Sequence, residues 1–454
     1  MQATTIVALS TPPGRSGIGV IRISGTSALA LTRSLLQDEN FNPEPQRASL
    51  RPLREPNGGD ILDHALVTYF KSPHSFTGED IVELSCHGSP PLLLTIIDTL
   101  LYLGARTADP GEFTMRGLIN GRLNLTQAEA IRDLIDAQTH AAVRQAARQL
   151  GGELSARLQP LKSSLLDVIV PLESSLEFVE DDLPQDISEL VSHKLLVLAN
   201  TLKALADTFR KGRLLKEGLR VTFAGRPNVG KSSLFNSLLQ SERAIVTDIP
   251  GTTRDTLSEV IDIKGIPVLI TDTAGVRTSS DRIEQLGVER TQRAIVDADM
   301  IVVVIDGSQP LGVEDLRVIE DAAQSRFIIA LNKNDLPVND LESIHELSNS
   351  APISSVSAKT GSGLDSLCTA IIEPFSANEI FESNFIITNA RHYDLLCRTE
   401  NAILSSQNLL SRHASEELVL VGLYDALRFL GNVTGETTPE DVLTQIFSTF
   451  CIGK

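Results

Sequence analysis

The stretch that most constrains this chain is an octapeptide at 225–232, GRPNVGKS, which fits the pattern G-x-x-x-x-G-K-[ST]. It follows an apolar stretch at 219–224 and precedes a helical pattern at 232–239. In this setting the backbone N–H groups at a helix start approach phosphate oxygens, and the helix dipole favours their negative charge. We therefore expect a strand, a phosphate-binding loop and a helix, with Lys231 reaching the β and γ phosphates and Ser232 binding Mg²⁺.

Three further short segments of the same block complete a nucleotide-binding pattern. An apolar stretch at 269–273 ends in DTAG at 272–275, whose aspartate would hold Mg²⁺ through water and whose glycine N–H would meet the γ-phosphate. A second stretch at 327–331 ends in NKND, and the carboxylate of Asp335 can accept two N–H groups from guanine, which adenine does not offer. Ser357-Ala358-Lys359 follows at a spacing that suits a backbone N–H to guanine O6. The set predicts a Ras-like P-loop domain that hydrolyses GTP.

The expected GTP contacts come from these motifs and from the loop after residue 246. They are Asn228, Val229, Gly230, Lys231, Ser232, Ser233, Thr247, Asp248, Ile249, Pro250, Gly251, Thr252, Thr253, Asp272, Thr273, Ala274, Gly275, Asn332, Lys333, Asp335, Ser357, Ala358 and Lys359.

Two details bear on how hydrolysis would proceed. Val276 stands after Gly275, where Ras-like proteins place a water-orienting Gln, so another group must orient the water. Glu284 is one candidate acid, although a solvated helix charge is the commoner role for such a residue. Asn228 and the loop 247–255 offer neutral oxygens that suit a weakly hydrated monovalent cation, which could supply positive charge beside the phosphates. An ordinary switch loop is the alternative.

The pattern on either side of this block is different. Residues 1–118 mix short apolar stretches with turn clusters, which predicts a small α/β domain. Its expected strands lie near 5–8, 19–23, 65–70 and 80–85, and its expected helices at 91–103 and from 109–112 onward. Helical periodicity runs from about 120 to 216 and returns after 375. Thr126 and Glu129 have the spacing of a capping box at the start of the first helix.

These patterns predict a multidomain chain with α/β and all-α parts. The expected parts are an N-terminal α/β domain at 1–118, a long-helix bundle at 119–217, the P-loop domain at 218–375 and a second helical segment at 376–454. In the last part we expect helices at 389–411 and 416–430, and one more that begins near Thr438. The P-loop domain would then be inserted into a helical domain.

Composition excludes several classes of protein. The four cysteines have no metal-site spacing, no apolar run reaches the ~18 residues of a membrane span, and no signal peptide is visible. We therefore expect a cytoplasmic protein without membrane contact. The net charge is −18, of which −8 falls on 219–374 and only −2 on 1–150. This distribution leaves room for a local basic site in the N-terminal part.

Further short segments carry a resemblance to a known family. They are TPPGR at 11–15, RISG at 22–25, SFTGED at 75–80, PGEF at 110–113, GTTRD at 251–255 and the C-terminal CIGK at 451–454. With the nucleotide motifs, these segments make the whole chain similar to the MnmE (TrmE) family of tRNA-modification GTPases. The resemblance implies a folate-binding dimerisation domain, a discontinuous helical domain and a GTPase domain inserted into it.

The same resemblance implies an activity and partners. The family's GTP hydrolysis is activated by potassium, and its members work as homodimers with an FAD-dependent MnmG-type subunit in a heterotetramer. The pair adds an aminomethyl or carboxymethylaminomethyl group to C5 of the wobble uridine of certain tRNAs. The one-carbon unit would come from 5,10-methylene-tetrahydrofolate or 5-formyl-tetrahydrofolate.

Carried over residue by residue, the resemblance assigns roles to particular side chains. Asn228, Thr247, Ile249 and Thr252 resemble the K⁺ ligands, Ser232 and Thr253 the Mg²⁺ ligands, Glu284 the catalytic acid, and Arg22, Glu79, Arg122 and Lys454 the folate contacts. Arg122 departs from the family, where a Lys is expected, and its planar fork differs from a point donor. Basic groups suit the glutamate tail of a folate, and Glu79 suits its pterin N–H groups. A structural ion pair is the alternative for Arg22 and Glu79.

Cys451 lies in the C-terminal tetrapeptide, after Phe447 and Phe450. It is either a thiol delivered to the folate site, with a catalytic or positioning role, or a small buried hydrophobe. Two other functions compete with GTP-driven tRNA modification. One is a GTP-switched ribosome or RNA assembly factor, which usually carries a basic RNA-binding segment, and the other is a folate enzyme whose GTPase reports nucleotide state.

Overall fold

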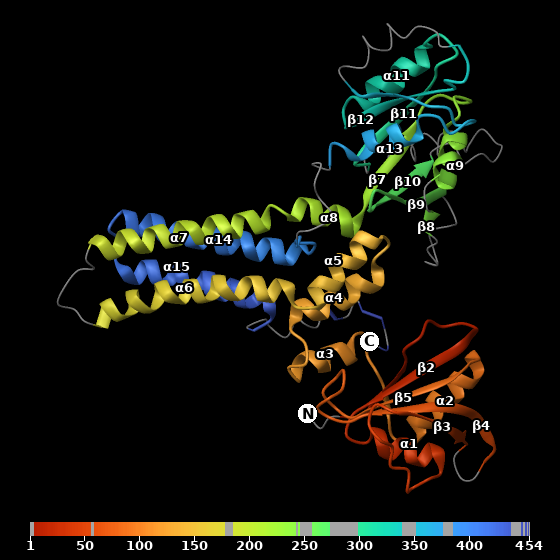
Figure 1. Ribbon diagram of the computed structural model, residues 1–454, viewed down its shortest axis with the longest axis vertical. Coiled ribbons are helices and arrows are strands. Elements are labelled where there is room, and N and C mark those ends of the chain that lie inside the picture. The colour runs from red at the N-terminus through yellow and green to blue at the C-terminus, as the bar shows by residue number, and fades with distance from the viewer. Residues whose placement is uncertain are drawn as a thin grey trace, which may run out of the picture. The chain divides into compact units, whose positions relative to one another are not determined.

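The structure is a computed structural model that describes residues 4–55, 59–177, 185–241, 244–245, 257–272, 298–337, 351–375, 385–436, 446–447, 450–451 and 453. Contacts divide the chain, drawn in Figure 1, into two compact units. The first comprises Met1–Arg132, Gln149–Leu166 and Tyr424–Lys454, and the second comprises Asp133–Arg148 and Asp167–Leu423.

The first unit contains a six-stranded sheet in the order β3-β4-β5-β2-β1-β6. Its strands are β1 (Ile6–Leu9), β2 (Ser16–Ser24), β3 (Ala48–Arg54), β4 (Ile61–Phe70), β5 (Ile81–Gly88) and β6 (Arg106–Thr107). Helices α1 (Ala28–Leu36), α2 (Pro90–Tyr102) and α3 (Glu112–Ile119) accompany them. Neighbouring strands are antiparallel, apart from β1 and β6, which are parallel.

Successive side chains along each strand point to opposite faces, and the two faces of this sheet carry different residues. On β2, Ile21 and Ile23 are fully buried and belong to one hydrophobic cluster with α1 and α2. Arg22 lies between them, so its side chain leaves the sheet on the other face. There Ile6 and Phe113 of α3 form a second, smaller cluster. The sheet therefore separates a helix-covered core from a face that carries Arg22 and α3.

The expected strands of this domain are confirmed as parts of β1, β2, β4 and β5, and the two expected helices as α2 and α3. Helix α1 and strands β3 and β6 were not expected. Strand β3 contains Pro52 and two arginines, which weaken a strand pattern. It lies at the edge of the sheet, where a proline does not break a ladder between two neighbours.

Among the described residues, the expected helical stretch before residue 217 contains five helices, and two more follow the α/β block. They are α4 (Leu125–Asp136), α5 (His140–Leu150), α6 (Glu153–Glu177), α7 (Gln185–Ala206), α8 (Phe209–Glu217), α14 (Ala390–Ser411) and α15 (Glu416–Thr434). Helices α7 and α14 lie side by side (Figure 1). Gln145 Nε2 donates a 2.8 Å hydrogen bond to the carbonyl of Ile386. The helical segments before and after the α/β block thus pack together, which confirms the predicted insertion.

The cap of α4 differs from the expected one. Asn124 Oδ1 accepts the N–H of Gln127 at 2.9 Å, and Gln127 Oε1 accepts the N–H of Asn124 at 3.1 Å. The capping box is therefore Asn124 with Gln127, two residues earlier than the predicted pair, and Thr126 lies inside the helix. Asn and Gln fill the two positions as well as Thr and Glu do, so both registers fit the sequence. The helix expected near Thr438 lies outside the described residues.

The second unit contains a seven-stranded sheet in the order β13-β12-β11-β7-β10-β9-β8. Its strands are β7 (Leu219–Ala224), β8 (Ala244–Ile245), β9 (Leu257–Ile263), β10 (Ile266–Asp272), β11 (Met300–Asp306), β12 (Phe327–Asn332) and β13 (Ile353–Ser355). Its helices include α9 (Lys231–Ser241), α11 (Val313–Ala322) and α13 (Leu364–Ile372). Strands β13, β12, β11, β7 and β10 are parallel, and β9 pairs antiparallel with β10.

The central parallel strands of this sheet are the buried ones. Every residue of β11 is buried, with Val302 and Val304 in one cluster and Ile301 and Ile305 in the cluster on the other face. Parallel strands end at one edge of a sheet, so the loops after β7, β10, β12 and β13 meet there. In the described ranges, no helix combines the length and apolar character required to span a bilayer.

Candidate functional site

The loop between β7 and α9 has a backbone that few residues other than glycine adopt. Gly225 has φ +151°, and a Cβ there would lie 2.5 Å from the carbonyl oxygen of Val304. Asn228 and Gly230 also have positive φ, +65° and +97°. Only glycine fits at 225, and Asn is among the residues that tolerate the left-handed region best. The phosphate-binding octapeptide therefore forms the strand–loop–helix unit that the sequence predicts.

Lys231 begins α9, one residue before the predicted start of the helix. Its side chain is buried, and Nζ donates to the carbonyls of Gly225 at 2.6 Å and Arg226 at 2.9 Å. An ammonium held by the loop beside a helix N-terminus is the arrangement that attracts phosphate oxygens. Ser232 and Ser233 follow in the first helical turn and are exposed.

Asn332 joins the phosphate-binding loop to the loop after β13. Its Nδ2 donates to the carbonyl of Val229 at 2.9 Å, and its Oδ1 accepts the N–H of Ala358 at 3.0 Å. The side chain is buried, with 2% of the residue exposed. Both halves of the amide are thus satisfied by backbone groups from two separate loops, which fixes the spacing between them.

Lys333 and Asp335 follow Asn332 at the same edge. Lys333 Nζ lies 2.6 Å from Asp306 Oδ2 at the end of β11. Ser357 Oγ donates to Asp335 Oδ1 at 2.7 Å. This hydrogen bond, with smaller contributions from Lys359 and Lys333, lowers the pKa of the Asp335 carboxyl below its ordinary value. Asp335 is therefore ionised at neutral pH, and an ionised carboxylate can accept two N–H groups from one base edge.

Several predicted residues lie outside the described part of the chain. They are Thr247, Asp248, Ile249, Pro250, Gly251, Thr252, Thr253, Thr273, Ala274, Gly275 and Glu284 in the second unit, and Lys454 in the first. Of Asp272 the structure gives the backbone, which ends β10 and pairs with Phe223 of β7. Sequence reasoning missed Asp306, which anchors Lys333. Its signal was an acidic residue at the end of an otherwise apolar strand.

In the first unit, Arg22 and Glu79 lie in ion pairs with other partners and not with each other. Arg22 faces Glu83 across the β2–β5 ladder, with Nη2 2.7 Å and Nε 2.9 Å from Glu83 Oε1. The guanidinium carbon lies 5.5 Å from the ring centroid of Phe76 and 5.7 Å from that of Phe113. The Glu83 carboxylate and the two rings hold Arg22 on the α3 face of the sheet.

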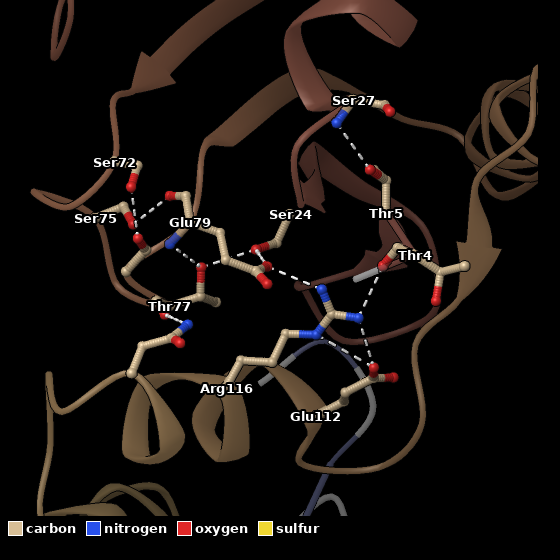
Figure 2. A network of polar contacts seen from close by, with 12 residues as sticks. Thr4, Thr5, Ser24, Ser27, Ser72, Ser75, Thr77, Glu79, Glu112 and Arg116 are labelled. Carbon is tan, nitrogen blue, oxygen red and sulfur yellow. Dashed lines mark hydrogen bonds and ion pairs between the residues drawn. The ribbon is translucent and has the colours of Figure 1, made fainter. Parts of the chain in front are cut away.

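Glu79 belongs to a polar network that Figure 2 shows in detail. Its Oε2 accepts from Ser24 Oγ at 2.8 Å and from Arg116 Nη1 at 2.8 Å. Its backbone N–H donates to Thr77 Oγ1, and its carbonyl accepts from Ser75 Oγ. Arg122, the predicted neighbour of Glu79, donates from Nε to the carbonyl of Ser75 at 3.2 Å. Glu79 and Arg122 therefore each form a hydrogen bond with Ser75.

Sequence reasoning missed the basic and acidic partners from α3 and β6 in this network. Arg116 Nη2 lies 2.8 Å from Glu112 Oε1, and Arg106 Nη2 lies 2.6 Å from the same oxygen. Burial raises the pKa of Glu112, but hydrogen bonds from Arg106, the Asp109 N–H and Arg116 outweigh it and lower the pKa below its ordinary value. Glu112 stands in the PGEF segment, whose residues the sequence marked without assigning a role.

The C-terminal tail lies against this unit. Ser10 Oγ donates to the carbonyl of Gly453 at 3.0 Å, and the N–H of Gly111 donates to the carbonyl of Cys451 at 3.4 Å. Phe447 and Phe450 pack in one cluster with Ala128. Cys451 itself is exposed, which excludes the alternative that it is a small buried hydrophobe. Cys86 and Cys368 are buried, as expected of structural cysteines.

Comparison with known proteins identifies the family. A family model described as the MnmE helical domain matches residues 125–451, and one described as the GTP-binding protein TrmE N-terminus matches residues 5–122. The chain belongs to the MnmE family. It is 44% identical over 455 residues to the tRNA modification GTPase MnmE of Koribacter versatilis, covering 99% of both chains. To that of Aquifex aeolicus it is 42% identical over 451 residues, again with 99% of both covered.

Among solved structures, the G domain of the T. maritima FeoB iron transporter aligns at 28% identity with a TM-score of 0.28. The alignment covers 34% of this chain and 97% of that one. At that TM-score it supports no conclusion. The MnmE assignment rests on the family models and the full-length relatives.

Proposed function

We propose that this MnmE-family chain is a GTP hydrolase that drives tRNA modification, as the names of its relatives indicate. The observation that carries the GTP part is the edge formed by Lys231, Asn332 and Asp335. A phosphate-binding loop is joined there through one amide to a base-binding loop with an ionised carboxylate. Mg²⁺ would be held by Ser232 and Thr253 and would neutralise charge on the phosphates.

A bound K⁺ would supply further positive charge during hydrolysis. The proposed ligands are Asn228, Thr247, Ile249 and Thr252, of which Asn228 lies in the described loop with φ +65°. We expect GTP hydrolysis to be faster in K⁺ than in Na⁺ at equal ionic strength. Equal rates in both salts would refute the K⁺ site.

Glu284→Ala should slow hydrolysis while GTP affinity stays within about twofold, because a catalytic acid acts on the transition state.

In the first unit the proposed ligand is a reduced folate that donates one carbon. Arg22, Glu79, Arg122 and Lys454 are its proposed contacts. Glu79 supports this role because its Oε1 has no hydrogen-bond partner in the described residues, while the carboxylate is fixed through Oε2. Arg22 supports it because its guanidinium contacts a carboxylate and two aromatic rings, which hold it on the α3 face.

We further propose that the homodimer forms through the N-terminal sheet. Leu50 and Leu66 pair across β3 and β4 on the face opposite α1 and α2, and they are 62% and 45% exposed. Ile18 on β2 is 61% exposed. Exposed apolar residues gathered on one sheet face are typical of protein interfaces. Leu50→Lys with Leu66→Lys should convert the dimer to a monomer in light-scattering measurements, and an unchanged mass would refute this interface.

The full reaction would also need an FAD-dependent MnmG-type partner, with which the chain would add an aminomethyl or carboxymethylaminomethyl group to the wobble uridine of tRNA. Mass spectrometry of tRNA nucleosides from a deletion strain tests this function directly. Loss of the C5-modified uridines, restored by the wild-type gene, is the expected result. Unchanged uridines would favour an RNA assembly factor instead.

Cys451→Ser should hydrolyse GTP normally and fail to restore the modification if the exposed thiol acts at the folate site.

A further inference from the structure

Arg116 lies at the centre of the polar network in Figure 2. Its Nη1 donates to Glu79 Oε2 at 2.8 Å, and its Nη2 donates to Glu112 Oε1 at 2.8 Å and to the carbonyl of Thr4 at 2.9 Å. The side chain is 12% exposed. A guanidinium bound to three acceptors in fixed directions has little freedom to reorient, so its Nη1–H has a defined direction towards Glu79.

The consequence for Glu79 is an unequal use of its two carboxylate oxygens. Oε2 receives both the Arg116 and the Ser24 hydrogen bonds, which use its two lone pairs. Oε1 has no partner in the described residues, and the Glu79 side chain is 17% exposed. A ligand that reaches Glu79 therefore finds one oxygen, Oε1, with its acceptor capacity unused and its direction fixed.

We propose that Arg116 is a positioning residue of the folate site, which holds Glu79 so that Oε1 accepts the N–H groups of a pterin. This inference rests on the proposed binding of a reduced folate by Glu79. Arg116 does not touch the ligand. It acts through Glu79 by occupying Oε2 and by supplying the positive charge that favours a carboxylate acceptor at a site shielded from water.

A purely structural role would be to anchor α3 through Glu112. Glu112 has a second arginine for that purpose, because Arg106 Nη2 lies 2.6 Å from Glu112 Oε1. Arg106 does not contact Glu79. The two arginines therefore share the anchoring contact and differ in the Glu79 contact. Arg106 provides a matched control.

The test compares Arg116→Gln and Arg106→Gln in the full chain by titration with 5-formyl-tetrahydrofolate in a calorimeter. A hydrogen bond to a charged group is worth enough that Arg116→Gln should raise the folate Kd about 10- to 100-fold. Arg106→Gln should change it by no more than about twofold, and Arg116→Lys, which retains the charge, should recover part of the loss. Equal effects of the two Gln variants would show that Arg116 only anchors α3, and would overturn the proposal.

A double-mutant cycle provides the second readout. In a Glu79→Gln background, Arg116→Gln should add little further loss of folate affinity, because its effect passes through Glu79. Additive losses would overturn the proposal even if Arg116→Gln alone were damaging or poorly folded. A wild-type chain that does not bind 5-formyl-tetrahydrofolate at all would instead refute the folate site itself. The two failures are thus distinguished by the wild-type titration.

Discussion

Asn332 and Val229 are joined by a 2.9 Å hydrogen bond from a buried side-chain amide to a carbonyl of the phosphate-binding loop. The same amide accepts the N–H of Ala358. The residue that ends β12 therefore sets the distance between the loop that would hold phosphates and the loop that would hold the base.

We expect Asn332→Ala to destabilise the second unit by about 1–3 kcal/mol, because it removes the partners of a buried carbonyl and of a half-buried N–H. It should also weaken binding of a fluorescent GDP analogue about tenfold or more, since the two loops are no longer tied. Ser237→Ala is the control, because Ser237 Oγ contacts the neighbouring carbonyl of Ala358 without joining the two loops. Equal GDP affinities of the two variants would contradict the role assigned to Asn332.

The nucleotide site could be predicted because its residues stand in short contiguous motifs. Gly225 and Asp335 lie in loops that follow strands β7 and β12, Lys231 begins the helix after the first of these loops, and a parallel sheet brings such strand ends to one edge. Their contacts are then determined by the local loop conformation. Asp306 was missed because one carboxylate at the end of an apolar strand does not by itself form a motif.

The N-terminal network could not be predicted in the same way. Glu79 and Arg116 are 37 residues apart, and Arg22 and Glu83 are 61 apart. The sequence predicts that such residues are charged and partly buried, but their pairing depends on strand register and on where α3 packs. The strand register places Glu83 opposite Arg22, and Glu79 instead pairs with Arg116 of α3. Sequence patterns carry no comparable signal for contacts of this separation.

Asp335→Asn should change the base preference of the nucleotide site. The variant loses two charge-assisted hydrogen bonds from guanine, so GTP affinity should fall about 100-fold or more. Xanthine carries a carbonyl where guanine has an amine, and the Asn amide can donate to it, so binding of XTP should increase. Competition titrations with both nucleotides measure this. Asn334→Ala changes the same turn without removing a described side-chain contact and should keep the guanine preference. Parallel losses of GTP and XTP would contradict the assignment.

Gly111→Ala should release the C-terminal tail. Gly111 has φ +68°, and a Cβ there would lie 2.8 Å from the carbonyl oxygen of Phe447 and 3.0 Å from Phe450 Cβ. Gly121 also has φ +68°, but nothing lies within 4 Å of its added Cβ, so Gly121→Ala isolates the backbone strain of about 1 kcal/mol.

Carboxypeptidase digestion should therefore shorten the Gly111→Ala chain rapidly and the Gly121→Ala chain at nearly the wild-type rate. The released variant should also lose tRNA modification if Cys451 and Lys454 act at the folate site. If both variants resist digestion equally, the tail is held by contacts other than those around Gly111.

Glu112→Gln should alter the pH dependence of stability in the first unit. Burial raises the pKa of Glu112, but the hydrogen bonds from Arg106, Asp109 and Arg116 outweigh it and lower the pKa in the folded state. A group with a lowered folded pKa contributes stability that is fully present above its unfolded value of about 4.3 and is lost as pH falls through the folded value. The wild-type chain should therefore have the higher melting temperature at neutral pH, and the difference should shrink in acid. Scanning calorimetry of both chains from about pH 7 down to about pH 2, below the unfolded pKa, measures this. Glu39→Gln, at an exposed carboxylate without a described contact, should melt like the wild type throughout. A difference between Glu112→Gln and wild type that stays constant with pH would mean that Glu112 contributes by packing and not by its charge.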